Sequence, residues 1–187
     1  DESGYQQRKA TVRLDHDWQE WRVSGVLEGS DLDQETAGYI RGLDAYKDDS
    51  AREENSNPEA YRDAWSARGY LSFSTELGTG GELLLRPYWR SNEMTFLQHY
   101  LPWQATETNR HQSVGVQAMV SGLTSRLRWL AGVDIDHTKG SLFEDQAEFF
   151  SPNQPDGVHY DYEVDANSLG AFTHLDWSIT ERWRLDA

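Results

Sequence analysis

The 187 residues contain no cysteine, which excludes disulfide bonds and thiolate metal sites. Long apolar runs are also missing: no run reaches the roughly eighteen residues that a membrane-spanning helix requires, and the mean hydropathy is -0.80. A helix across a membrane is therefore excluded. A membrane β-barrel stays open, because only every second residue of a barrel strand has to face lipid.

Basic residues are scarce as well, since 17 Lys and Arg face 32 Asp and Glu and give a formal charge of -15. Such a surface repels phosphate, so nucleic acid is not expected as a partner. Aromatic residues, in contrast, make up 12% of a very polar chain. Their amphipathic rings suit a bilayer interface, although composition alone favours an ordinary soluble β domain rich in aromatics.

The stretch from His111 to Asp136 alternates apolar and polar residues through two arms on either side of a small polar turn. The apolar positions are Val114, Val116, Ala118 and Val120 in the first arm, and Leu127, Trp129, Ala131, Val133 and Ile135 in the second. Alternation with period two predicts a β-hairpin. Each arm is about ten residues long, and about nine to eleven tilted residues cross a bilayer.

Similar alternation elsewhere predicts an all-β chain, an antiparallel up-and-down meander of about eight long strands. We expect strands at about 7–16, 21–29, 65–77, 82–92, 110–121, 126–137, 164–178 and 183–187. Long connections are expected at about 30–64, 93–109 and 138–163. Asn57 followed by Pro58 predicts the start of a short helix that reaches Asp63. Pro87 cannot donate to a ladder, so a weakened pair is expected there.

The connections between these strands are alternately short and long. Short turns fall near residues 18, 79, 123 and 180, so all tight turns lie at one end of the sheet and all long loops at the other. This is the layout of outer-membrane barrels. Trp18, Trp21, Trp177 and Trp183 flank tight turns, and we expect them to form an aromatic girdle at one membrane interface. Arginines on the polar faces would line a wet interior.

Three phrases carry a resemblance to a known family. They are RGYLSFSTELGTGGELLLRPYWRSNEMTFLQHYLP from Arg68 to Pro102, SVGVQAMVSGLTSRLRWLAGVDID from Ser113 to Asp136, and LGAFTHLDWSITERWRLDA from Leu169 to Ala187. The chain resembles a middle portion of the barrel of a TonB-dependent outer-membrane receptor. The resemblance implies a barrel of about 22 strands with a plugged lumen, in the outer membrane of a Gram-negative bacterium. Members import ferric siderophores, or sometimes cobalamin or other metal chelates.

The resemblance also implies partners: outer-membrane lipid and lipopolysaccharide, a metal chelate, and an energising TonB-type inner-membrane complex that acts through a plug domain. The chain departs from a full member because it lacks the plug, holds only about eight strands and ends at Ala187 without a terminal aromatic strand. Residues 1–187 are therefore expected to be a single partial barrel segment, a fragment from inside a longer protein. No cofactor is expected.

No enzyme signature occurs, and the six histidines show no metal-ligand spacing, so neither a catalytic residue nor a metal site is predicted. Asp134 and Asp136 could suit acid and base work or calcium, but fit polar residues of the lumen better. The candidates for ligand binding are Tyr88, Arg90, Asn92, His99, Tyr100, Trp103, Phe149, Phe150, His159 and Tyr160. Arginine forks and aromatic faces suit an anionic iron chelate. A local basic patch at Arg86 and Arg90 would have to offset the overall negative charge.

Two other functions compete with this hypothesis. A small complete outer-membrane barrel with a structural or adhesive role would pair its eighth strand with its first. A soluble carbohydrate-binding or hydrolytic β domain would bury Leu127, Trp129 and Val133 against a second sheet.

Overall fold

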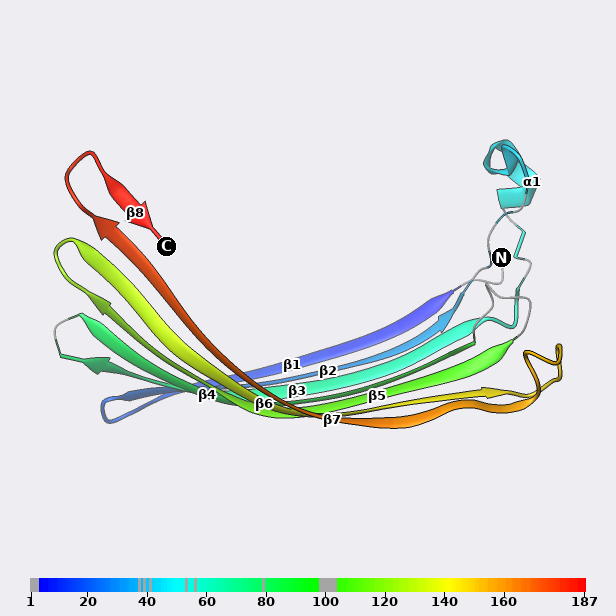
Figure 1. Cartoon of the computed structure of the whole chain (residues 1–187), viewed down its shortest axis with the longest axis horizontal. Coiled ribbons are helices and arrows are strands. Elements are labelled where there is room, and N and C mark those ends of the chain that lie inside the picture. The colour runs from blue at the N-terminus through cyan, green and yellow to red at the C-terminus, as the bar shows by residue number, and fades with distance from the viewer. Residues whose placement is uncertain are drawn as a thin grey trace.

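One curved antiparallel sheet makes up almost the whole computed structural model (Figure 1), which describes residues 4–187 except 37, 39, 41, 53, 56, 79 and 98–103. The fold is all-β, as predicted: eight strands follow in chain order, and each pairs with its neighbours in sequence. The strands are β1 (Tyr5–Trp18), β2 (Trp21–Glu35), β3 (Tyr61–Leu77), β4 (Gly81–Leu97), β5 (Ala105–Leu123), β6 (Leu127–Gln146), β7 (Gly157–Ser178) and β8 (Arg184–Asp186).

Helix is limited to two short turns, η1 (Ala45–Lys47) and α1 (Asp49–Arg52). Asp48 precedes α1 as its cap, because its Oδ1 accepts a hydrogen bond of 2.9 Å from the Ser50 amide. Within the described ranges, no helix has the length and apolar character to span a membrane.

The strands continue further toward the long loops than the sequence predicted. The connections are 36–60, 98–104 and 147–156, in place of 30–64, 93–109 and 138–163. The prediction was wrong because both faces of the strand ends are polar, as in Ser30–Glu35 of β2, so the period-two signal disappears while the backbone ladder continues. At the other end β8 covers 184–186, inside the expected 183–187.

The helix expected from Pro58 to Asp63 is also wrong. The Ala60 amide donates to the Asn57 carbonyl at 3.0 Å to close a turn, and β3 begins at the next residue. The weakened pair at Pro87 is confirmed: the β3–β4 pairing stops at Tyr70–Tyr88 and resumes at Phe73–Leu85 in the same register.

The register places most apolar residues of the strands on one face. Residues directly opposite each other share a face, and one such row runs Phe73, Leu85, Ala118, Val133 and Ala171 across β3 to β7. The rows on either side are similarly apolar. Together they form a continuous belt, which we call the apolar band, on the convex face of the sheet.

The apolar band is open to its surroundings. Leu14 and Leu169 in it are 73% and 77% exposed, and the buried hydrophobic residues among those described are Ala60 and Ala105, both at the long-loop end. Leu175 is 39% exposed. The described sheet therefore builds no apolar core of its own, and its apolar side chains point away from the protein.

The height of the apolar band fits a bilayer. From Leu169 to Trp177 the band covers eight residue steps, which is about 26 Å along a strand and about 20 Å along the membrane normal at a tilt of roughly 40°. Two hydroxyls inside the band are satisfied by backbone: Thr75 donates to the Glu20 carbonyl at 2.9 Å, and Thr173 donates to the Leu130 carbonyl at 3.0 Å. Lipid requires such internal partners, because it offers none.

All tight turns lie at one end of the sheet, at the left of Figure 1, and the longer connections join strand ends at the right. Trp18 pairs with Trp21 across the first turn, Trp177 pairs with Leu185, and Trp183 directly precedes β8. These four residues thus stand at the short-turn end. Their role as an interfacial girdle stays a prediction.

Candidate functional site

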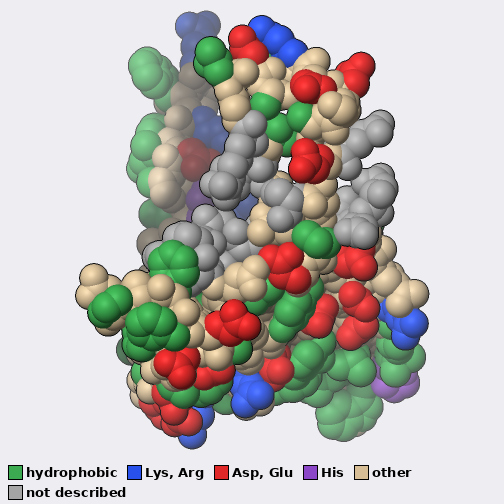
Figure 2. Space-filling model, turned by 90° about the vertical axis from the view of Figure 1, so that its right-hand side faces the viewer, with side chains coloured by type: hydrophobic (Ala, Val, Ile, Leu, Met, Phe, Trp, Pro, Cys, Tyr) green, Lys and Arg blue, Asp and Glu red, His purple; other side chains and the backbone are tan. Residues whose placement is uncertain are grey.

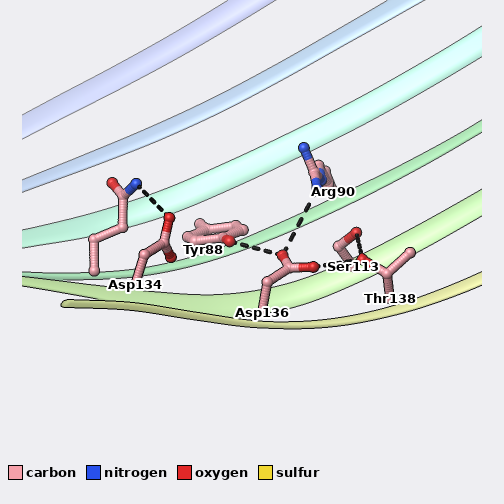
Figure 3. Close-up of polar contacts among 7 residues, drawn as sticks. Tyr88, Arg90, Ser113, Asp134, Asp136 and Thr138 are labelled. Atoms are coloured by element: carbon pink, nitrogen blue, oxygen red, sulfur yellow. Dashed lines mark hydrogen bonds and ion pairs between the residues drawn. The ribbon is translucent and has the colours of Figure 1, made fainter. Parts of the chain in front are cut away.

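The concave face of the sheet carries charged and hydroxyl side chains, as Figure 3 shows for its centre. In its middle part, arginines and carboxylates match one for one: Arg13, Arg68, Arg86 and Arg90 against Asp15, Glu28, Asp134 and Asp136. The chain as a whole has a formal charge of -15. The surplus of acid therefore lies elsewhere, mainly toward the long loops.

Asp136 on β6 is the centre of this face (Figure 3). Its Oδ2 accepts a hydrogen bond of 2.7 Å from the Tyr88 hydroxyl on β4, and its Oδ1 accepts one from the Thr138 hydroxyl. Thr138 in turn lies 2.8 Å from the Ser113 hydroxyl. Arg90 Nη2 is 3.7 Å from Asp136 Oδ2, which is an ion pair beyond hydrogen-bond range.

The contact between Tyr88 and Asp136 skips one strand, and Gly115 on β5 makes it possible. Gly115 is directly opposite both residues. A Cβ at this position would lie 2.4 Å from the Tyr88 ring, so the ring rests on bare backbone. Only glycine leaves the space for this close approach.

Other polar contacts extend the network along the concave face. Asp15 Oδ2 lies 2.8 Å from Arg13 Nε, and the Arg86 guanidinium lies 5.1 Å from the centre of the Tyr70 ring. Within the described part of the chain, Arg86 Nε and Asp134 Oδ1 have no hydrogen-bond partner. Buried polar atoms normally find one, so these two atoms are exceptions on this face.

The predicted ligand residues fall into two groups. Tyr88, Arg90 and Asn92 alternate along β4 and share the concave face. His159 and Tyr160 begin β7, close to Phe149 and Phe150 of the connection 147–156. His99, Tyr100 and Trp103 lie outside the described residues.

The distance between the two groups follows from the register. The row of Tyr88 reaches β7 at Ser168, and eight residues separate Ser168 from Tyr160, which is about 26 Å of strand. Asn92 lies closer, because its row reaches β7 at Val164, four residues from Tyr160, which is about 13 Å of strand. Tyr88 and Tyr160 are therefore too far apart for one small ligand to contact both.

His159 closes the connection 147–156 onto the sheet. The β6–β7 register shifts at Glu144 and Asp145, which leaves His159 as the extra residue of a bulge. Its Nε2 lies 2.8 Å from the Pro155 carbonyl oxygen and its Nδ1 3.0 Å from Glu144 Oε1. Both partners are acceptors, so both ring nitrogens must carry a proton to make both bonds. The Pro155 carbonyl and then the Glu144 carboxylate raise the pKa of His159 above its ordinary value.

Sequence reasoning missed several residues of the concave face, including Ser113, Thr138, Lys9 and His111. Each is unremarkable in the sequence and gains its place only through pairing with distant strands. Trp65 and Trp89 are 42% and 41% exposed. They lie on the convex face, near the edge of the apolar band that faces the long loops. The alternation of Trp89 with Leu85 was a signal that could have suggested a second aromatic row. Where the chain is described, no group of three or more His, Asp and Glu is suited to hold a metal ion.

The comparisons with known proteins bear on the fold. No family model and no curated protein matches the chain. The structure is similar to the crystal structure of the ferric citrate transporter FecA in the unliganded form, with a TM-score of 0.66 and 10% sequence identity. The match covers 99% of this chain and 35% of FecA. At this identity the likeness shows the fold alone: the sheet has the shape of one part of a β-barrel.

Proposed function

We propose that the chain forms part of the wall of a TonB-dependent outer-membrane receptor that takes up a ferric siderophore or a similar metal chelate. The observation that carries this proposal is the exposed apolar band on a sheet without a core of its own. In water, a belt of this extent would be an aggregation site. In lipid, it is the ordinary outer surface of a barrel. The likeness in shape to part of FecA supports the same assignment.

The two faces and two ends then have separate tasks. The apolar band contacts lipid, the concave face lines the lumen, and the long loops meet the ligand outside the cell. Figure 2, which views the long-loop end, shows many acidic side chains there. They come from strand ends such as Asp31–Glu35 of β2 and Asp161–Glu163 of β7. A chelate passes this acidic rim before it reaches the arginines on the wall below.

The test uses the full-length protein, expressed in a Gram-negative host with and without a functional TonB complex. We expect the protein in the outer-membrane fraction, with the heat-dependent gel mobility of a folded barrel. Uptake of radioactive iron, supplied as a panel of siderophores, is expected only where TonB is present. Recovery of the protein in the soluble fraction without detergent would contradict the proposal.

Two structural observations favour this function over its alternatives. A small closed barrel requires β1 to pair with β8, whereas these strands stand at opposite edges of an open sheet. A soluble two-sheet domain requires a second layer over Leu127, Trp129 and Val133. All eight strands of the described chain belong to one sheet, and Val133 is 41% exposed.

A further inference from the structure

A hollow on the concave face is lined by cationic side chains, although the chain as a whole is strongly acidic. We call it the basic hollow, and its polar lining includes Lys9, Arg68, Arg90, His111, Ser66 and Asn92, with one acid, Glu28. Lys9 and His111 lie three residues beyond Val12 and Val114, which belong to the last apolar row of the convex face on the side of the long loops. The hollow therefore lies near the outer edge of the membrane, on the side of the long loops.

Arg68 and Arg90 stand directly opposite each other on β3 and β4. Like charges in this position destabilise a sheet. Arg68 turns to Glu28 on β2 and forms an ion pair with it. Arg90 has no such solution, because Asp136 lies 3.7 Å away and already accepts hydrogen bonds from Tyr88 and Thr138.

Arg90 is thus left with a half-exposed guanidinium to which no described residue hydrogen-bonds. A fork of this kind binds carboxylate or phosphate with two parallel hydrogen bonds. Two like charges thus stand opposite each other and only Arg68 has a hydrogen-bonded acid; violations of a local rule of sheet design are expected at functional sites.

Lys9 and His111 extend the basic hollow on either side. Lys9 is exposed on β1 and makes no hydrogen bond or ion pair with any described residue. Its row continues through Ser30 and Ser66, whose hydroxyls are 2.8 Å apart, to Asn92 and His111 on β5. Four strand spacings separate Lys9 from His111, which is about 19 Å. Hydrogen-bond donors spread over this width suit a ligand with several anionic groups.

We infer that the basic hollow binds the carboxylates of a polyanionic ligand, with Arg90 as the fork that holds one carboxylate and with Lys9 and His111 on others. The inference rests on the proposed function, because the hollow faces an incoming ligand only in the lumen of a barrel. It narrows the substrate class to carboxylate-rich chelates and makes this wall a binding station below the acidic rim.

The experiment measures anion binding by the full-length protein in detergent, by equilibrium dialysis at low ionic strength. Tricarballylate, with three carboxylates, is the probe and acetate is its monovalent counterpart. The test variant is Lys9→Gln/Arg90→Gln. The control variant Arg13→Gln/Arg22→Gln removes the same charge from the concave face outside the hollow, where both arginines have acidic neighbours at 2.8 and 3.9 Å.

We expect tricarballylate to bind at least about tenfold more tightly than acetate. The test variant is expected to lose at least about tenfold in tricarballylate affinity, which is about 1.4 kcal/mol, and the control less than threefold. Equal losses in both variants would assign the effect to the general field of the lumen and overturn the inference. Failure of the unaltered protein to bind tricarballylate would do the same.

Fractionation and iron uptake are measured on the same preparations, which keeps the two proposals apart. One outcome is that the protein is found in the outer membrane and imports iron, while the Lys9→Gln/Arg90→Gln variant binds tricarballylate as tightly as the unaltered protein. This outcome would support the proposed function and contradict the inference about the basic hollow. A protein absent from the outer membrane loses both. Heat-dependent gel mobility confirms that each variant is folded.

Discussion

The two faces of the sheet are built from alternate residues of the same strands, yet they are stabilised in opposite ways. On the convex face, side chains such as Leu85 and Val133 are 40% and 41% exposed and need only an apolar environment. On the concave face, the central charged group has particular partners: Asp136 accepts hydrogen bonds from Tyr88 and Thr138. The convex face therefore depends on its solvent, whereas the concave face depends on its contacts.

This difference means that substitutions on neighbouring residues should have very different effects. A substitution that changes the polarity of a side chain should alter stability most on the convex face. A substitution that changes the shape of a side chain should alter stability most on the concave face. Tests of the two faces can therefore use the same substitution at adjacent or paired positions.

The largest effect is expected from Leu85→Arg. Leu85 lies in the middle of the apolar band of β4, between Phe73 and Ala118. An arginine facing the bilayer midplane destabilises a barrel by about 2 to 4 kcal/mol. The free energy of unfolding in urea, measured on the full-length protein refolded into phospholipid vesicles, should fall by this amount.

Leu84→Arg is the matched control, because Leu84 is the preceding residue and faces the concave side opposite Ser74 and Met119. Its arginine reaches water in the lumen, so we expect a loss of about 1 kcal/mol from contacts alone. If Leu85→Arg were tolerated as well as Leu84→Arg, the convex face would not lie in lipid. In a soluble protein, an arginine at an exposed position such as Leu85 would be nearly neutral.

The next effect concerns shape on the concave face. Gly115→Ala places a methyl group 2.4 Å from the Tyr88 ring and 2.6 Å from the Ile135 carbonyl, so the ring must move and its hydrogen bond to Asp136 breaks. We expect a loss of about 1 to 3 kcal/mol, the usual range for overpacking. The same urea titration in vesicles measures it.

Gly170→Ala is the control on the same face. Gly170 is opposite Asp134 on β7, and a Cβ there would meet nothing within 4 Å. Without a clash, alanine should be neutral or stabilise by up to about 1 kcal/mol, because it has less backbone freedom to lose. Equal losses at both glycines would show that the Tyr88 ring does not depend on the bare backbone at Gly115.

The sequence predicted the convex face well, because a period of two is visible wherever one face must be apolar. The alternation of Val114, Val116 and Ala118 predicts β5 from the local sequence alone. The same signal fades at Asp31 and Asp33 of β2, where polar residues dominate both faces, so the strand ends were placed too early. The period-two pattern marks a strand only along the part where one of its faces is apolar.

The concave network could not be predicted because it depends on register between strands far apart in the sequence. Tyr88 and Asp136 are separated by 48 positions and meet across Gly115, which is one residue of a third strand. A shift of one residue in either pairing would turn Tyr88 and Asp136 to opposite faces. Arg90 was singled out for its chemistry, but Lys9 and His111 carried no local signal.

The smallest predicted effect is at His159, where the alternation fails and the residue belongs to neither face. The bulge turns its side chain, only 12% exposed, toward Glu144 and the Pro155 carbonyl. These acceptors raise its pKa above the ordinary value of about 6.5. The protonated ring therefore holds the connection 147–156 fully below about pH 6.5, and this hold is lost as the pH rises through the raised pKa.

A spin label at Asn153→Cys measures this change, since residues 1–187 contain no cysteine and Asn153 is exposed. Label mobility should increase as the pH rises from about 6.5 through the raised pKa of His159. In His159→Gln the label mobility should be high and nearly independent of pH. A glutamine amide is neutral, so it cannot replace the charged ring that donates to both Glu144 and the Pro155 carbonyl. A pH response that survives in His159→Gln would show that His159 does not control the mobility of this connection. The bulge at His159 would then serve only to keep β6 and β7 in register. The long-loop end of the sheet would then not depend on the protonation of this ring.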